Sequence, residues 1–143
     1  MRSFLVLLIA FGLFGCDTFN RDQLLVRSAI GNEEAKSVEI SVAEAATAFA
    51  ENKGLINKTA ESKVQDTLLY YQSSDEYFPI TLGARKVADG VVIDLLHFHP
   101  GSGETAAYSQ MKLELSEILI GRFGTAVTVM EDGQHYAIEQ KSP

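Results

Sequence analysis

Two histidines in the segment HFHPGSGE, residues 97–104, are the side chains of this chain best suited to bind a metal ion. His97 and His99 are two positions apart, so a β-strand projects both to the same side, and neutral imidazole is a common metal ligand. A zinc site requires a third and usually a fourth ligand. His135 and Glu104 are candidates, but no spacing brings either one close to the pair. The alternative is structural: His97 closes the rim of a core face and His99 ends the strand.

The glycines of the same segment precede an expected helix, whose backbone N–H groups are suited to an anion. However, the segment lacks the lysine that follows the glycines of a P-loop, and it does not complete the dinucleotide-binding fingerprint. Ser102 in GSG matches only part of the G-x-S-x-G nucleophile elbow, and three histidines define no ordered triad. We therefore interpret 100–105 as a turn in which Ser102 or Thr105 caps the next helix. A small periplasmic metal-binding protein or hydrolase using 97–104 is the alternative function.

The only cysteine of the chain, Cys16, directly follows an apolar run. One positive residue, Arg2, precedes the apolar residues 4–14, and Gly15 stands before the cysteine. This is the layout of a secretory signal peptide. Eleven helical residues at about 1.5 Å each fall well short of a ~30 Å hydrocarbon core, which disfavours a transmembrane helix. A single cysteine also excludes an internal disulfide and a zinc site made of cysteines alone.

Leu13, Gly15 and Cys16 resemble the lipobox of bacterial lipoproteins, with a branched apolar residue three positions before the cysteine and a small residue one position before it. Phe14 stands where that pattern usually has a small residue. The resemblance covers the first sixteen residues and implies that residues 1–15 are cleaved and that the Cys16 thiol carries a diacylglyceryl group. Two or three acyl chains, at about 0.8 kcal/mol per buried methylene, anchor a protein durably. The alternative is that Cys16 is an ordinary apolar residue of a signal sequence or of an uncleaved core.

Asp17 follows the cysteine, and in enterobacteria an aspartate there resembles the signal that retains lipoproteins on the inner membrane. The resemblance therefore implies a lipid-anchored protein of the bacterial cell envelope that faces the periplasm, with the inner membrane favoured by Asp17. Residues 16–35 are polar at both ends around an apolar patch at Leu24, Leu25, Val26 and Ile30. We expect them to form the lipidated N-terminus and a tether, which includes either one helical turn or a short strand. Residues 36–143 are expected to form a single domain.

Charge and composition limit the class of partner. The 143 residues include 12 Lys and Arg against 19 Asp and Glu, which gives a net charge of −7. A protein with this balance is not attracted to nucleic acid over long range, and no basic stripe offsets it. Hydrophobic residues make up 46% of the chain, which is enough for one packed core and argues against disorder.

The hydrophobic pattern predicts two helices and about five strands. Ser41 and Glu44 form a capping box ahead of apolar residues at helical spacing, which predicts a helix over 42–53 that ends at Lys53-Gly54. A longer helix is predicted over 104–122, where Tyr108 and Met111 begin an apolar stripe. Runs of strand-forming residues predict strands over 67–72, 78–87, 91–98, 125–130 and 134–139.

Two Asp-Gly pairs, 89–90 and 132–133, predict hairpins with two-residue loops. The expected cross-strand pairs are Arg85 with Asp94, Leu82 with His97, Val127 with Ile138, and Val129 with Tyr136. The face of the first hairpin that we expect in the core carries Ile80, Leu82, Ala84, Ile93 and Leu95. Its other face, with Val87, Val92, Leu96 and Phe98, is also apolar, so both faces are candidates for burial.

These elements predict an α+β fold: a single two-layer sandwich of about five mainly antiparallel strands and two main helices, with one strand-helix-strand crossover. We expect a membrane-anchored envelope lipoprotein that acts as a protein-binding or modulating module, such as an assembly factor, an inhibitor or an immunity-type protein. Its acidic surface suits a basic target. The predicted partners are the membrane and an envelope protein, and no cofactor is predicted beyond the covalent lipid on Cys16. One ring of Tyr70 and Tyr71 is expected to enter the core, while the other suits an interface.

Overall fold

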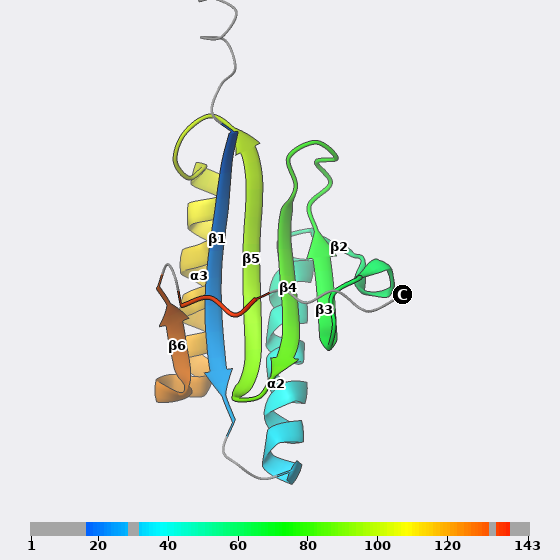
Figure 1. Cartoon of the computed structure of the whole chain (residues 1–143), viewed down its shortest axis with the longest axis vertical. Helices are drawn as coiled ribbons and strands as arrows, with labels where there is room; N and C mark the ends of the chain where they lie inside the picture. Colours follow the sequence, from blue (N-terminus) through cyan, green and yellow to red (C-terminus); the bar gives the residue numbers. More distant parts are fainter. Residues whose placement is uncertain (1–16, 29–31, 132–133, 138–143) are drawn as a thin grey trace, which may run out of the picture.

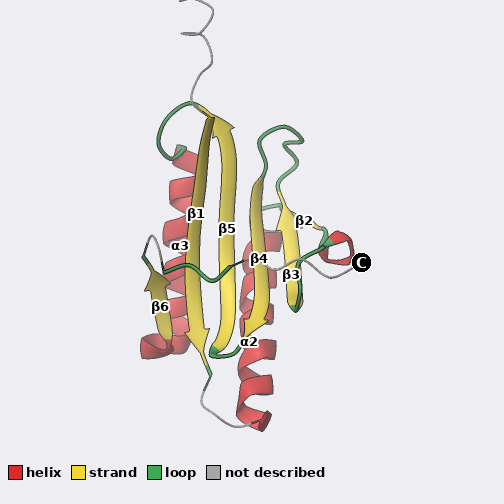
Figure 2. Cartoon of the chain, in the orientation of Figure 1, coloured by secondary structure: helices red, strands yellow, loops and turns green. Residues whose placement is uncertain are grey.

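The computed structural model describes residues 17–28, 32–131 and 134–137 (Figure 1). Within these residues, six strands form one sheet in the order β2-β3-β4-β5-β1-β6, and every neighbouring pair is antiparallel. Two helices cover one face of this sheet and leave the other face, here called the open face, without a helical layer (Figure 2). The predicted α+β two-layer sandwich is confirmed. The elements are β1 Asp17–Arg27, α2 Asn32–Asn52, β2 Ile56–Asn57, η1 Thr59–Glu61, β3 Thr67–Gln72, β4 Ile80–Val87, β5 Gly90–Pro100, α3 Ala106–Phe123, η2 Gly124–Ala126 and β6 Val127–Met130.

Strand β1 corrects the predicted tether over residues 16–35. It pairs with β5 along its whole length and with β6 on its other side. Leu24 and Val26 belong to the core beneath the helices, while the alternating Gln23 and Leu25 are buried on the open face. A strand with neighbours on both sides can bury its polar residues because adjacent strands supply their partners. The folded domain therefore includes residues that the sequence pattern assigned to a linker.

Helix α2 begins at Asn32 rather than at residue 42, so Ser41 lies inside the helix and does not cap it. Residues 33–41 contain good helix formers and neither proline nor glycine, and Val38 packs against the core from this extra stretch. The predicted end is close to the observed one. Gly54, just beyond the helix, has a φ of +68°, which glycine adopts readily.

The β4–β5 hairpin has a register two residues away from the predicted one. Val87 pairs with Gly90, so the loop is 88–89, and the predicted partners Leu82 and His97 pair instead with Leu95 and Ile80. Gly90 belongs to the strand because it lies against β1 at a φ of +146°, and a Cβ there would lie 2.1 Å from the carbonyl oxygen of Val26. An even shift leaves every side chain on its predicted face. The five residues predicted for the core face are accordingly all in the core.

Helix α3 connects β5 to β6 as the predicted strand-helix-strand crossover, with β1 between the two strands. The second predicted hairpin is wrong. Val129 pairs with Leu24 of β1, not with Tyr136, and residues 134–137 run across the open face in front of β1 and β5 (Figure 1). Residues 132–133 and Ile138 lie outside the described residues. None of the described helices is both long and apolar enough to span a bilayer.

Candidate functional site

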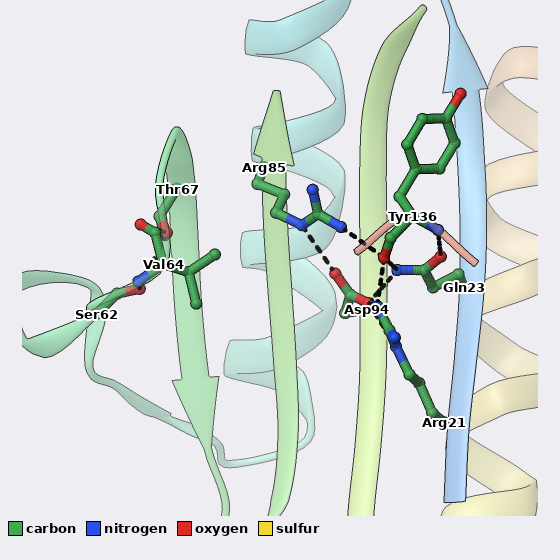
Figure 3. Close-up of polar contacts among 8 residues, drawn as sticks. All are labelled: Arg21, Gln23, Ser62, Val64, Thr67, Arg85, Asp94 and Tyr136. Atoms are coloured by element: carbon green, nitrogen blue, oxygen red, sulfur yellow. Dashed lines mark hydrogen bonds and ion pairs between the residues drawn. The ribbon is translucent and has the colours of Figure 1, made fainter. Parts of the chain in front are cut away.

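The open face carries a cluster of polar side chains, most of them buried, which we call the polar cluster (Figure 3). Arg21 and Gln23 come from β1, Arg85 from β4 and Asp94 from β5, while Tyr136 lies in the segment that crosses them. Alternate residues of a strand share a face, and β4, β5 and β1 are neighbours. The sheet register therefore brings together groups up to 73 residues apart in the sequence.

The carboxylate of Asp94 is the centre of the polar cluster. Its Oδ1 accepts hydrogen bonds from Arg21 Nη2 at 3.1 Å and from Gln23 Nε2 at 2.5 Å, and its Oδ2 accepts one from Arg85 Nε at 3.4 Å. Gln23, Arg85 and Asp94 are all less than a tenth exposed. Hydrogen bonds between charged groups of this kind are the strong ones. Because both oxygens are occupied by donors, Asp94 organises the face and is poorly placed to accept a proton from a substrate.

The same side chains hold the main chain of Tyr136. Its carbonyl oxygen accepts hydrogen bonds from Arg21 at 2.7 Å and from Gln23 and Arg85 at 3.1 Å each. Its N–H donates to Gln23 Oε1 at 2.7 Å, so one glutamine bonds both polar groups of one residue. Two guanidinium groups face one carboxylate, and each also donates to the Tyr136 carbonyl oxygen. These contacts hold the main chain of Tyr136 on the open face.

The side chain of Tyr136 provides a further attachment at the β4–β5 hairpin. Its hydroxyl donates a hydrogen bond to Asp89 Oδ2 at 2.7 Å. This bond to a carboxylate raises the pKa of the Tyr136 phenol, because losing the proton would place a second negative charge beside the first. The segment 134–137 is therefore fixed at both its backbone and its ring.

A cavity of about 50 Å³ lies beside the polar cluster, between β3, β4 and β5. Ser62, Val64 and Thr67 line the side toward β3 (Figure 3), and Thr81 and Arg85 belong to the opposite wall. Sites for organic ligands usually measure about 300–1,000 Å³, so this cavity is of a size for water. It adds a mostly apolar depression beside the polar cluster on the open face.

The structure brings His97 and His99 together on the helix-covered face of β5, as their spacing predicts. The rings stack with centroids 4.8 Å apart, and both residues are buried. The nitrogens of His99 lie 3.0 Å from the Pro100 carbonyl oxygen and 2.8 Å from that of Gly103, and His97 Nδ1 lies 3.3 Å from Thr105 Oγ1. Among the described residues, no three His, Cys, Asp or Glu side chains gather as metal ligands do. A metal site at His97 and His99 stays an alternative hypothesis, and their contacts with Pro100, Gly103 and Thr105 are those expected of structural residues.

Burial sets the chemistry of the residues next to the histidine pair. His97 stacks on Tyr108 at 5.7 Å, and its pKa is lowered by loss of solvation and by the neighbouring His99. The Tyr108 hydroxyl lies 2.8 Å from both Asp22 Oδ2 and the Leu95 carbonyl oxygen. Burial and the Asp22 carboxylate raise the pKa of this phenol, so it stays protonated. A neutral imidazole beside a neutral phenol is a packing arrangement rather than an acid-base pair.

The remaining candidates from the sequence have separate roles. Thr105 caps α3 as predicted, its hydroxyl accepting a hydrogen bond from the Tyr108 N–H, whereas Ser102 is exposed in the preceding loop. Glu104 is engaged by Lys112 and Ser109, and both hydrogen bonds lower the pKa of its carboxyl. His135 lies in the segment that crosses the opposite face of the sheet, and Cys16 lies outside the described residues.

Sequence reasoning missed the polar cluster, although one signal for it was present. Asp94 interrupts the apolar run VVIDLLHF, and a carboxylate in a buried strand requires charged or hydrogen-bonding partners. Arg85 and Asp94, which were expected to lie opposite each other, do form an ion pair, although the register pairs Arg85 with Val92. Arg21 and Gln23 were missed because β1 was assigned to a linker.

Comparisons of this chain with protein-family models, with curated proteins and with solved structures found no match.

Proposed function

We propose that this chain is a bacterial envelope lipoprotein, anchored by lipid on Cys16, and that its open sheet face binds another envelope protein. The observation that carries the proposal is the pair of hydrogen bonds at Gln23, whose Oε1 accepts from the Tyr136 N–H and whose Nε2 donates to the Tyr136 carbonyl oxygen. Recognition of an extended segment through its backbone is a recurring mode of peptide binding. The open face thus has the chemistry of a protein-binding surface.

The exposure of a tyrosine near the polar cluster also supports protein binding at the open face. On β3, Tyr71 is buried in the core, whereas Tyr70 is half-buried on the open face beside the cavity. The prediction that one ring enters the core and the other does not is confirmed. Tyrosine suits interfaces because its ring buries apolar area while its hydroxyl keeps a hydrogen bond. The partner surface proposed here therefore includes Tyr70 and the neighbouring cavity.

Site-directed cross-linking tests the protein-binding part of the proposal. A photo-reactive amino acid at Tyr70 is expected to give one discrete cross-linked product in native membranes. The control position is Ile118, which is 42% exposed on α3 in the helical layer, away from the open face. Binding through the open face is contradicted if the Tyr70 position gives no cross-linked product, or if both positions give the same product.

The lipid anchor is tested separately at the cysteine. A Cys16→Ser variant is expected to accumulate as an uncleaved precursor and to incorporate no labelled lipid. The intact mass of the wild-type chain isolated from membranes should include the diacylglyceryl group. If Cys16→Ser is processed to the same mature size, lipidation at this position is wrong.

A further inference from the structure

Four aromatic side chains gather at one end of the sheet, and we call them the aromatic rim: Phe19, Tyr77, Phe78 and Phe98. This is the end at which β1 begins, β5 ends and residues 73–79 connect β3 to β4 (Figure 1). Phe19 and Phe98 are register partners on the open face, and the rings of Phe78 and Phe98 are 6.4 Å apart. The exposed fractions are 61% for Phe19, 42% for Phe98 and 83% for Tyr77. Large apolar side chains gathered and exposed in this way mark an interaction surface.

The rim lies next to the proposed lipid attachment point. Cys16 is three residues before Phe19, and at about 3.8 Å between successive Cα atoms the two Cα atoms are at most ~11 Å apart. Acyl chains on Cys16 would therefore enter a bilayer beside these rings. Resting on the proposed lipidation, we propose that the aromatic rim lies in the headgroup region of the membrane and forms a second contact of the domain with the bilayer.

The loop that carries two of the rings is held in a defined shape. Asp75 Oδ1 accepts hydrogen bonds from the backbone N–H groups of Tyr77 and Phe78, both at 2.9 Å. A carboxylate that bonds N–H groups two and three residues later fixes a turn, so the rings project with little ordering left to occur on binding. Tyrosine is enriched at the level of the headgroups, where its ring meets hydrocarbon and its hydroxyl meets water, and phenylalanine supplies apolar area to surfaces that lie in the interface.

The charges beside the rim define the kind of lipid surface. The loop 73–79 carries Asp75 and Glu76 and contains no lysine or arginine, and residues 17–19 add only Asp17. Anionic lipids attract basic segments and repel acidic ones over about a Debye length. The contact is therefore apolar, and we expect it to be stronger on zwitterionic phosphatidylcholine than on a surface containing phosphatidylglycerol.

The absence of tryptophan from the sequence gives a direct test. The full chain carrying Tyr77→Trp is isolated from membranes, its lipid is verified by mass, and it is reconstituted into phosphatidylcholine vesicles with brominated acyl chains. The tryptophan emission is expected to shift to shorter wavelength on reconstitution and to be quenched by the brominated acyl chains. The matched control is Ile120→Trp. Ile120 is 49% exposed and lies in the last turn of α3, whereas the first turn of this helix follows the rim end of β5, so the control position lies away from the rim. Its emission is expected not to change.

The outcomes separate the two proposals. Absence of lipid from Cys16 contradicts the proposed function. A lipidated chain whose Tyr77→Trp emission is unquenched, with unchanged circular dichroism, overturns the rim inference alone. Emission that responds to protein concentration and not to brominated lipid shows a second copy on the rim and also overturns it. Quenching that stays equal when phosphatidylglycerol replaces part of the phosphatidylcholine at low salt contradicts the predicted lipid preference.

Discussion

Replacement of Asp94 by alanine tests whether charge holds the polar cluster together. The substitution removes the carboxylate that lies between Arg21 and Arg85, with which it forms ion pairs at 3.1 and 3.4 Å. Both guanidinium groups and Gln23 keep a hydrogen bond to the Tyr136 carbonyl oxygen, so no side chain loses every partner. What the variant loses is the negative charge that compensates two neighbouring cations. It also leaves the Nε–H groups of Arg21 and Arg85 without the acceptor that Asp94 supplies, so the comparison with Asp94→Asn separates the effect of charge from that of hydrogen bonding.

The magnitude follows from the exposure of the three side chains. Removing one partner of a buried ion pair costs about 3–5 kcal/mol, because the other charge stays buried without compensation. The Arg85 side chain is 9% exposed and fits this case, whereas the Arg21 side chain is 20% exposed and is partly screened by water. We therefore expect Asp94→Ala to lower the free energy of unfolding by about 3 kcal/mol, at the lower end of that range. Asp94→Asn keeps an acceptor oxygen and is expected to cost less.

Urea denaturation followed by circular dichroism measures this change. The matched control is Glu61→Ala, because Glu61 pairs with Lys58 at 2.9 Å but its side chain is 67% exposed. An exposed pair of this kind contributes about 0–1 kcal/mol, so the control midpoint should scarcely move. An Asp94→Ala variant with the same midpoint as the control would refute the reasoning, since it would mean that the Asp94 charge contributes nothing.

Three further predictions concern the helix-covered side of the sheet and the β4–β5 turn. Tyr108→Phe removes the hydrogen bond that the buried Tyr108 hydroxyl makes with Asp22 or with the Leu95 carbonyl oxygen. Urea denaturation should show a free energy of unfolding lower by about 1–2 kcal/mol. An unchanged midpoint would show that this bond is not stabilising. Gly90→Ala places a Cβ 2.1 Å from the Val26 carbonyl oxygen at a φ of +146°. It should lower the free energy of unfolding by at least about 2 kcal/mol, which is measured as a lower melting temperature. A variant as stable as the parent would contradict the close approach of β5 to β1. The lowered pKa of His97 means that the unfolded chain binds the proton more tightly, so stability is lost as pH falls through the ordinary value of 6.5. His97→Gln should therefore lose less stability than the parent between about pH 7.5 and 5.5; parallel losses would show that His97 does not carry this dependence.

The sequence predicted the core face of the β4–β5 hairpin correctly because hydrophobic alternation survives an even shift in register. It did not predict the register itself, since the position of Gly90 depends on contact with β1, a strand far away in the chain. The histidine pair was placed on one face by the two-residue period of a strand. Among the residues that the structure describes, no third ligand lies with the pair, and this depends on packing that spacing does not reveal.

The missed elements have a common physical cause. β1 has an uneven pattern because polar Arg21 and Gln23 are satisfied by Asp94 and Tyr136, partners that no local rule connects to them. The capping box at Ser41 was misleading because strong helix formers upstream extend α2 past it to Asn32. Both errors arise where tertiary contacts, or the sum of several propensities, override a short motif.

The place of β1 in the sheet has a consequence for the order in which the protein folds. Arg27 pairs with Gly90 and Asp17 with Pro100, so the first strand to be synthesised meets its neighbour only 63 to 83 residues later. At about 5–20 residues per second, ribosomes take roughly 3 to 17 s to make that intervening chain. Pairing between distant segments is also slow, because the loop must close before contacts form. The nascent chain consequently stays without its central strand pairing for seconds, a period in which it is open to chaperones and to passage through a narrow channel.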